Sequence, residues 1–206
     1  MVVKTKTKIG PQHQGHKMPL RTFEFAEVEP GYNYELARGF IVVSGIPDFY
    51  HGGQVDVIDY CLQVYRASNP GVIYRVCSGA DCKLIVDRWE SERHPDRAVY
   101  LSRPAGKKND KTWRTWIPDV IVEVVSARSV DRDYVEKREE YWDLGVKEYW
   151  IVDAAMGKIT QLRRGKSDWL AKELFAGDVV ETKLLPGFKL PCQPIFDAAA
   201  EHEDDY

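Results

Sequence analysis

Residues 116–126 read "WIPDVIVEVVS", an almost uninterrupted apolar run. A short continuous run of β-branched residues is typical of a strand that is buried on both faces. Glu123 interrupts this run. An isolated ionised carboxylate in an apolar sheet costs several kcal/mol, so we expect Glu123 to have a partner or a ligand.

The pattern changes to a helical period directly after this strand. Residues 129–145, "SVDRDYVEKREEYWDLG", carry a stripe with spacings of four and three, formed by Val130, Tyr134, Lys137, Tyr141 and Leu144. Ser129 or Asp131 can cap the start of a helix over 130–144, and Gly145 can end it. Residues 146–153, "VKEYWIVD", are apolar again. A strand, a helix and a strand in this order predict a right-handed crossover, so strands 117–126 and 147–153 should be parallel neighbours.

The rest of the chain predicts further strands and one more helix. We expect a hairpin over 33–45 that turns at Arg38-Gly39, a helix over 51–66, strands near 72–77, 82–88 and 97–102, a polar loop over 103–115, and antiparallel strands after 153. The fold class is mixed α/β with one central sheet flanked by helices and with added antiparallel strands. At 206 residues we expect one domain over 21–198, between a flexible basic leader (1–20) and an acidic tail (199–206).

Composition excludes several classes of protein. The chain is 44% hydrophobic and 30% charged, which is typical of a globular protein. No apolar run approaches the ~18 residues of a membrane helix, and the N-terminus has no apolar signal core. We therefore expect a cytoplasmic protein that does not enter a membrane. Its cysteines, Cys61, Cys77, Cys82 and Cys192, are then reduced core residues, because no C-x₂-C pair suggests zinc.

Positive charges cluster locally although the net charge is −3. Basic clusters occupy 1–21, 103–114 and 157–166. Such clusters can bind phosphates on an acidic protein, and solvated loops explain them equally well. The residues that we expect to contact nucleic acid are Lys107, Lys108, Lys111 and Arg114.

Lys137 is the second unusual residue. It occupies the middle of an apolar helical face, where it could extend its ammonium group to water or pair with Asp133 one turn earlier. The crossover lays this face on the sheet, so Lys137 can also reach the strand of Glu123. A second carboxylate, Asp96, starts the strand near 97–102. Two carboxylates can hold a divalent cation that activates water for phosphodiester hydrolysis, while a nearby ammonium group orients that water or supports the developing charge.

Five segments resemble a large bacterial family of restriction-endonuclease-like proteins, long classed as a domain of unknown function, in the PD-(D/E)XK nuclease superfamily. The family pattern includes "PDLVVEVLS" and "GVPEYWIVD", where this chain has "PDVIVEVVS" (118–126) and "GVKEYWIVD" (145–153). The segments "HPDRAVYLS" (94–102), "EKREEYW" (136–142) and "YELARGFIVVS" (34–44) are also similar to the family. The resemblance covers about 32–196 and implies a restriction-endonuclease-like fold.

The resemblance implies a role for each matching position. Asp96 and Glu123 become the metal-binding acids, with Mg²⁺ (or Mn²⁺) as the cofactor. The superfamily lysine, two residues beyond the acid, is replaced here by Val125, and Lys137 resembles the lysine that has moved to the following helix in some members. Glu35 is similar to an auxiliary acid, with an exposed hairpin glutamate as the alternative. His51 matches a histidine at the start of the family's helix, as a structural residue or a ligand.

Other carboxylates compete with this assignment. Asp119 lies roughly 13 Å along the strand from Glu123, too far to share one metal, and we interpret it as a strand-entry residue. Asp81, Asp87 and Glu90 are alternatives to Asp96, because strand boundaries are uncertain there. The chain also departs from the family: Arg38-Gly39-Phe40 replaces an Asp-Gly-Glu turn, and residues 126–129, "SARS", replace "SPS".

The implied function is a metal-dependent endonuclease that hydrolyses phosphodiester bonds in DNA. RNA is the alternative substrate to DNA. A homodimer of this chain is compatible with the implied function. The alternatives are a catalytically silent nuclease-fold protein that binds nucleic acid or a partner protein, and a structural domain with a buried Glu123–Lys137 pair. Binding of a divalent metal separates the nuclease from both.

Overall fold

The computed structural model describes residues 7–103, 105 and 112–200. Its main sheet has six strands in the order β12, β11, β10, β9, β8, β5. Their bounds are Trp169–Leu174, Lys158–Arg164, Glu148–Asp153, Val120–Val124, Arg97–Tyr100 and Arg75–Cys77 in that order. The pair β9–β10 is parallel, as predicted, and the other neighbours are antiparallel. The mixed α/β class is therefore confirmed.

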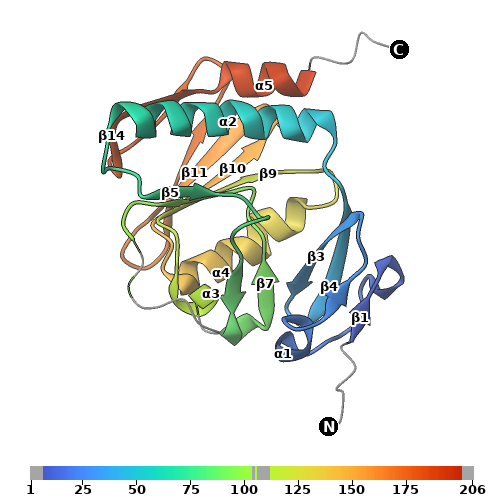
Figure 1. Ribbon diagram of the computed structural model, residues 1–206. Helices are drawn as coiled ribbons and strands as arrows, with labels where there is room; N and C mark the ends of the chain where they lie inside the picture. Colours follow the sequence, from blue (N-terminus) through green and yellow to red (C-terminus); the bar gives the residue numbers. More distant parts are fainter. Residues whose placement is uncertain (1–6, 104, 106–111, 201–206) are drawn as a thin grey trace.

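The predicted crossover helix covers one face of this sheet (Figure 1). Helical residues run from 130 to 144 and include a π-helical segment, Arg132–Glu136, followed by α4, Lys137–Leu144. Gly145 ends the helix with a φ of 90°, a conformation that favours glycine. Side chains of β9 alternate between the two faces, so that Ile121 joins the core with Tyr141 of α4.

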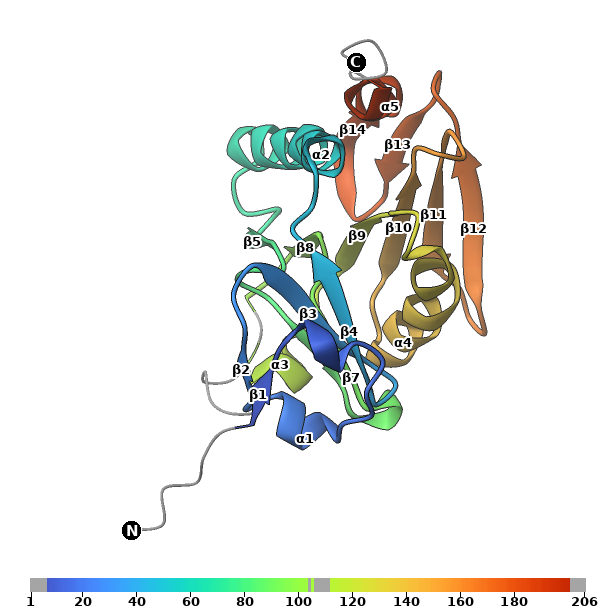
Figure 2. The ribbon, with the colours of Figure 1, turned by 90° about the vertical axis from the view of Figure 1, so that its right-hand side faces the viewer.

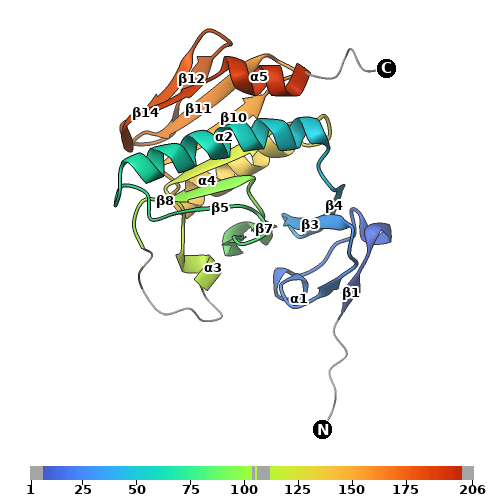
Figure 3. The same ribbon diagram turned by 45° about the horizontal axis from the view of Figure 1, so that its top comes forward.

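The opposite face of the sheet is covered by two other helices, as Figure 1 and the rotated view of Figure 3 show. These are α2, Phe49–Ser68, and α5, Gln193–Ala200. Val122 and Val124 of β9 pack into the core on this side, together with Ile58 and Leu62 of α2. The hairpin β13, Val179–Thr182, with β14, Leu185–Pro191, contributes to the same core. Consequently β9 is buried on both faces.

A second sheet, in which all neighbouring strands are antiparallel, lies beside the main one, and the sequence analysis did not separate its strands from the central sheet. Its order is β4, β3, β7, β6, with bounds Phe40–Gly45, Tyr32–Ala37, Ser91–Arg93 and Leu84–Val86. The predicted hairpin is present as β3 and β4, and its turn places Arg38 (φ 51°) and Gly39 (φ 83°) in the left-handed region. Figure 2 shows this sheet to one side of α4, with the N-terminal elements next to it.

Residues 7–20, expected in a flexible leader, are instead folded. Strand β1, Lys8–Ile9, pairs in parallel with β2, Glu27–Val28, and is followed by η1, Pro11–His13, and α1, Leu20–Phe23. Ile9, Leu20 and Phe23 are buried against the hairpin. Burial of these apolar side chains contributes a favourable free energy that offsets the loss of chain entropy when the segment is ordered. Residues 1–6 and the tail residues 201–206 lie outside the described residues.

The remaining elements are short. The predicted loop 103–115 ends in α3, Thr112–Thr115, and the turn between β6 and β7 is η2, Asp87–Trp89. All four cysteines are free thiols. In the part of the chain that the structure describes, no helix is both long and apolar enough to cross a bilayer.

Candidate active site

Glu123 faces the crossover helix from β9, where its residue is 3% exposed. Both carboxylate oxygens have partners on that helix. The Tyr141 hydroxyl donates to Oε1 at 2.6 Å, and Lys137 Nζ lies 3.0 Å from Oε2. The sequence argument that Glu123 requires a partner is therefore confirmed, and Lys137 and Tyr141 supply it.

Lys137 is buried at the junction of the π-helical segment and α4. Its backbone N–H donates to the carbonyl of Arg132, which is five residues earlier. π-Turns of this kind are frequent at functional sites. Lys137 Nζ also lies 2.9 Å from Asp133 Oδ1. The two alternatives for Lys137, a pair with Asp133 and a contact with Glu123, are thus both realised.

Asp96 lies directly before β8 and opposite Glu123. The antiparallel register pairs Arg97 with Val122, so the next position brings Asp96 across from Glu123. Asp96 Oδ2 accepts a hydrogen bond from the Val124 N–H at 2.7 Å. Its other oxygen, Oδ1, lies 3.0 Å from His51 Nε2, at the start of α2. Four elements therefore meet at this point: β8, β9, α2 and the crossover helix.

The local charges are unbalanced. Burial raises the pKa of Glu123 to about 8; the Lys137 ammonium opposes this shift, and the charges of Asp96 and Asp133 add to it. Burial also lowers the pKa of Lys137, but Asp133 and Glu123 outweigh that effect and hold it above its usual range. One ammonium thus serves several buried carboxylates, and an added cation would favour the ionised form of Glu123.

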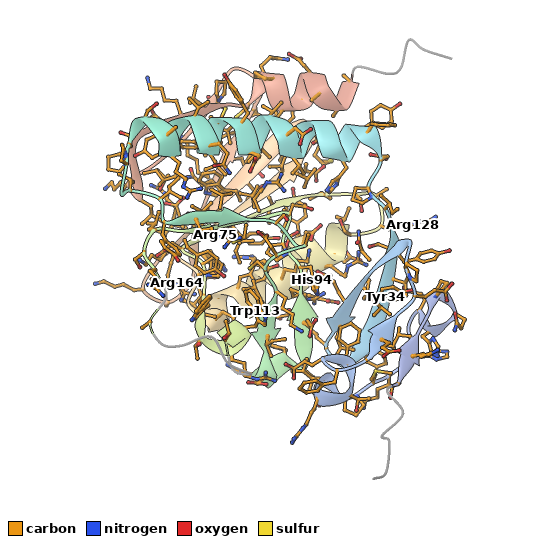
Figure 4. All side chains as sticks on the ribbon, viewed as in Figure 1. Tyr34, Arg75, His94, Trp113, Arg128 and Arg164 are labelled. Atoms are coloured by element: carbon orange, nitrogen blue, oxygen red, sulfur yellow. The ribbon has the colours of Figure 1, made fainter. Side chains whose placement is uncertain are left out.

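Glu35 reaches the same region from β3 of the second sheet. Its Oε1 accepts from the His94 N–H at 2.8 Å, and its Oε2 lies 3.5 Å from Arg93 Nη1. Burial disfavours the ionised form, but the charges of Lys137 and Arg93 and the His94 hydrogen bond lower the pKa of Glu35 to about 2. Glu35 is therefore not an exposed hairpin glutamate. Figure 4 shows His94 between the two sheets, near α4.

The sequence analysis did not identify Arg93, which is completely buried. Arg93 Nε donates to Glu140 Oε2 at 2.7 Å, and Nη2 donates to Glu140 Oε1 at 2.9 Å and to Glu136 Oε2 at 2.8 Å. These bonds attach β7 to the helix that carries Lys137. The sequence carried one signal for a buried cation here. The acidic run "EKREE" (136–140) ends at Glu140, which directly precedes Tyr141, a residue of the predicted inner stripe.

The other candidate carboxylates have structural roles. Asp119 accepts from the Leu101 N–H at 2.8 Å and lies 2.6 Å from Lys147 Nζ, in agreement with a strand-entry residue. Asp81 accepts from the Ser78 N–H, Asp87 pairs with Arg114, and Glu90 is an exposed turn residue. Asp96 alone among these alternatives lies opposite Glu123.

Of the four residues expected to contact nucleic acid, the structure describes only Arg114. Lys107, Lys108 and Lys111 lie outside the described residues. Arg114 Nη2 lies 2.7 Å from Glu24 Oε2, and Nε lies 2.9 Å from Asp87 Oδ2. Its charge is therefore already neutralised within the protein, which disfavours the expected role of Arg114 in phosphate binding.

The donor set suits a hard cation. Asp96 and Glu123 supply carboxylate oxygens from neighbouring strands, and Mg²⁺ is commonly held by one or two carboxylates with water and substrate phosphates. Among residues 7–103, 105 and 112–200, no group of three His, Cys, Asp or Glu side chains is arranged to hold a metal ion. A two-carboxylate site completed by water and phosphate fits this arrangement, whereas an all-protein cage does not.

Comparisons with known proteins agree with this architecture. A crystal structure of a "putative nuclease belonging to DUF820" from Anabaena variabilis ATCC 29413 superposes with a TM-score of 0.67 at 14% identity, over 88% of this chain and 99% of that chain. At this identity the likeness shows the fold alone. No curated protein matches the chain significantly. The model of the Uma2 family, described as "Putative restriction endonuclease", matches residues 20–193. The chain therefore belongs to the Uma2 family.

Proposed function

We propose that the chain is a metal-dependent endonuclease that hydrolyses phosphodiester bonds in DNA. The observation that carries this proposal is the contact of Lys137 Nζ with Glu123 Oε2 at 3.0 Å, directly opposite Asp96. A buried pair contributes little stability over apolar packing, so a charged cluster of this kind is better explained by a site. Membership of the Uma2 family supports a nuclease.

Each residue then has a role. Asp96 and Glu123 would hold Mg²⁺ (or Mn²⁺), which when bound lowers the pKa of water and neutralises phosphate charge. Lys137 places a fixed ammonium beside Glu123, where it stabilises negative charge that develops on the phosphate. Glu35 is the auxiliary acid, held by the His94 N–H and Arg93, and Arg93 joins the second sheet to the helix that carries Lys137. His51 orients Asp96 through the 3.0 Å contact with Oδ1. The same chemistry would act on RNA.

A catalytically silent protein that binds nucleic acid is the second candidate. One observation favours it: both carboxylate oxygens of Glu123 already have partners, the Tyr141 hydroxyl and Lys137 Nζ. A cation would have to share these oxygens or displace the contacts. The silent alternative predicts nucleic-acid binding that does not depend on Glu123 and no cleavage.

A plasmid-cleavage assay with Mg²⁺ or Mn²⁺ tests the proposal. The wild type should nick and linearise the plasmid, and Glu123→Ala should not. Glu139→Ala is the matched control, because Glu139 is an exposed glutamate of α4, the helix that carries Lys137, and pairs with Arg38. Equal cleavage by wild type and Glu123→Ala, or no cleavage by the wild type with either ion, would contradict the proposal.

A further inference from the structure

Two arginines that follow the strand of Glu123 have no partner within the described part of the chain. Arg128 is exposed in the turn 126–129. Arg132 starts the π-helical segment, and its Nε is buried without a hydrogen-bond partner. Other arginines near the site are neutralised, since Arg93 pairs with Glu140 and Arg97 with Asp59. Arg128 and Arg132 therefore keep their charge for an external anion.

The turn that carries Arg128 has a defined shape. The Ser126 N–H donates to Ser129 Oγ at 2.9 Å, and Ser129 Oγ is 3.2 Å from the Ser126 carbonyl oxygen. The turn begins two residues after Val124, whose N–H binds Asp96. The two arginines are thus attached to the strand end that carries the metal-binding acids. Asp131, which is also exposed, offsets only part of their charge.

An apolar surface lies across from this turn, at the connection between β4 and α2. Phe49 is 91% exposed and Ile46 is 74% exposed. Asp48 caps α2 through the His51 N–H at 2.8 Å, so the first helical turn that bears Phe49 is fixed. Its neighbour His51 contacts Asp96. In Figures 1 and 3 the segment after β9 passes beside the start of α2, and Figure 4 places Arg128 on this side of the molecule.

We propose that Arg128 and Arg132 bind the phosphate backbone of the substrate while Phe49 stacks on an unpaired base. The inference rests on the proposed nuclease function and names its substrate class: nucleic acid with single-stranded nucleotides beside the bond that is cut. Arginine charge complements phosphate. Proteins hold single strands by combining positive charges that follow the phosphate backbone with exposed aromatic rings, because every base has a face for stacking. Duplex bases, which are already stacked on each other, give Phe49 no free face.

Fluorescence anisotropy with a labelled single strand and with the same sequence as a blunt duplex tests the inference. Both are measured in EDTA, so that binding is separated from cleavage. The wild type should prefer the single strand. Phe49→Ala should weaken single-strand binding about 5- to 160-fold, the range for loss of one stacked base, with a smaller effect on the duplex. Phe25→Ala is the matched control, because Phe25 is 64% exposed and follows α1, a helix that Figure 1 shows at the opposite end of the molecule from α2.

The arginines are tested by salt dependence. The double variant Arg128→Gln/Arg132→Gln should reduce the slope of log affinity against log salt by about 1.4 for the single strand, which is about 0.7 for each phosphate contact. Arg88→Gln is the control, because the Arg88 side chain is 74% exposed in η2, the turn before β7, and Figure 1 shows β7 well below α2.

The outcomes separate this inference from the nuclease function. Equal binding of single strand and duplex by both wild type and Phe49→Ala would overturn the inference, and plasmid cleavage would still test the nuclease. If Phe49→Ala binds nucleic acid normally but changes a dimer to a monomer in sedimentation, the apolar surface contacts a second copy and the inference is wrong. No binding of either probe by a wild type that cleaves plasmid would also overturn it.

Discussion

Lys137 and Glu123 meet across the interface between helix and sheet, with Nζ 3.0 Å from Oε2. Lys137→Met keeps most of the side-chain volume and removes the charge. We expect cleavage to fall about 10²-fold or more, because one electrostatic contact to the transition state is lost, while Mn²⁺ binding persists.

The control for this change is Arg138→Met, which alters an adjacent residue whose nearest carboxylate, Asp168, is 3.5 Å away. Circular dichroism checks that both variants fold. Near-normal cleavage by Lys137→Met would show that Lys137 serves only as a structural partner of Glu123 and Asp133.

If Asp96 and Glu123, which lie opposite each other at β8 and β9, hold one metal ion, both should contribute to its binding. Asp96→Asn and Glu123→Gln should each weaken Mn²⁺ binding at least 10-fold, which is about 1.4 kcal/mol, as measured by titration calorimetry. Asp119→Asn changes a carboxylate that Lys147 already neutralises, so its Mn²⁺ affinity should match that of the wild type. A variant at position 96 or 123 with unchanged affinity would remove that residue from the site.

Glu35 should stabilise the fold in a defined range of pH. Its pKa in the folded protein is about 2, below the ordinary value of 4.5. Ionised Glu35 therefore stabilises the folded state above about pH 4.5, by up to about 3 kcal/mol, and this contribution is lost as the pH falls toward 2. The gap in the free energy of unfolding between wild type and Glu35→Gln should shrink between about pH 5 and about pH 3 in urea titrations. A constant gap would show that the charge of Glu35 contributes nothing.

The crossover was predictable because it is encoded locally. The apolar run of β9, the stripe of the helix, Gly145 and the apolar run of β10 each determine their own conformation, and short connections then leave one topology. The second sheet was not predictable in full, because β7 consists of Ser91, Glu92 and Arg93, which are buried through polar contacts. No hydrophobic period marks such a strand.

The candidate site, like the fold, was predictable only in part. Glu123 and Lys137 stand out because each is a charged residue within an apolar pattern. That Asp96 lies opposite Glu123 depends on the register of β8 and β9, which the intervening loop does not specify in sequence. Its place at the start of a predicted strand suggested Asp96, the resemblance agreed with that choice, and the structure supplies its neighbours. Asp133 and Tyr141 were noted only as neighbours of Lys137, because nothing in the sequence shows which of its contacts form.

Arg93 and Glu140 form a second buried pair, and its loss should be costly. Arg93→Met leaves the buried Glu140 with only Arg38, whose Nε lies 3.5 Å from Glu140 Oε1, so we expect the free energy of unfolding to fall by about 3–5 kcal/mol. Glu140→Leu in the same chain removes that carboxylate. The double variant should therefore be more stable than the sum of the single changes predicts, by about 1–3 kcal/mol in a double-mutant cycle measured by urea unfolding. Strictly additive changes would mean that Glu136 and Glu35 hold Arg93 without Glu140, and that the link from β7 to the Lys137 helix does not depend on the bidentate pair.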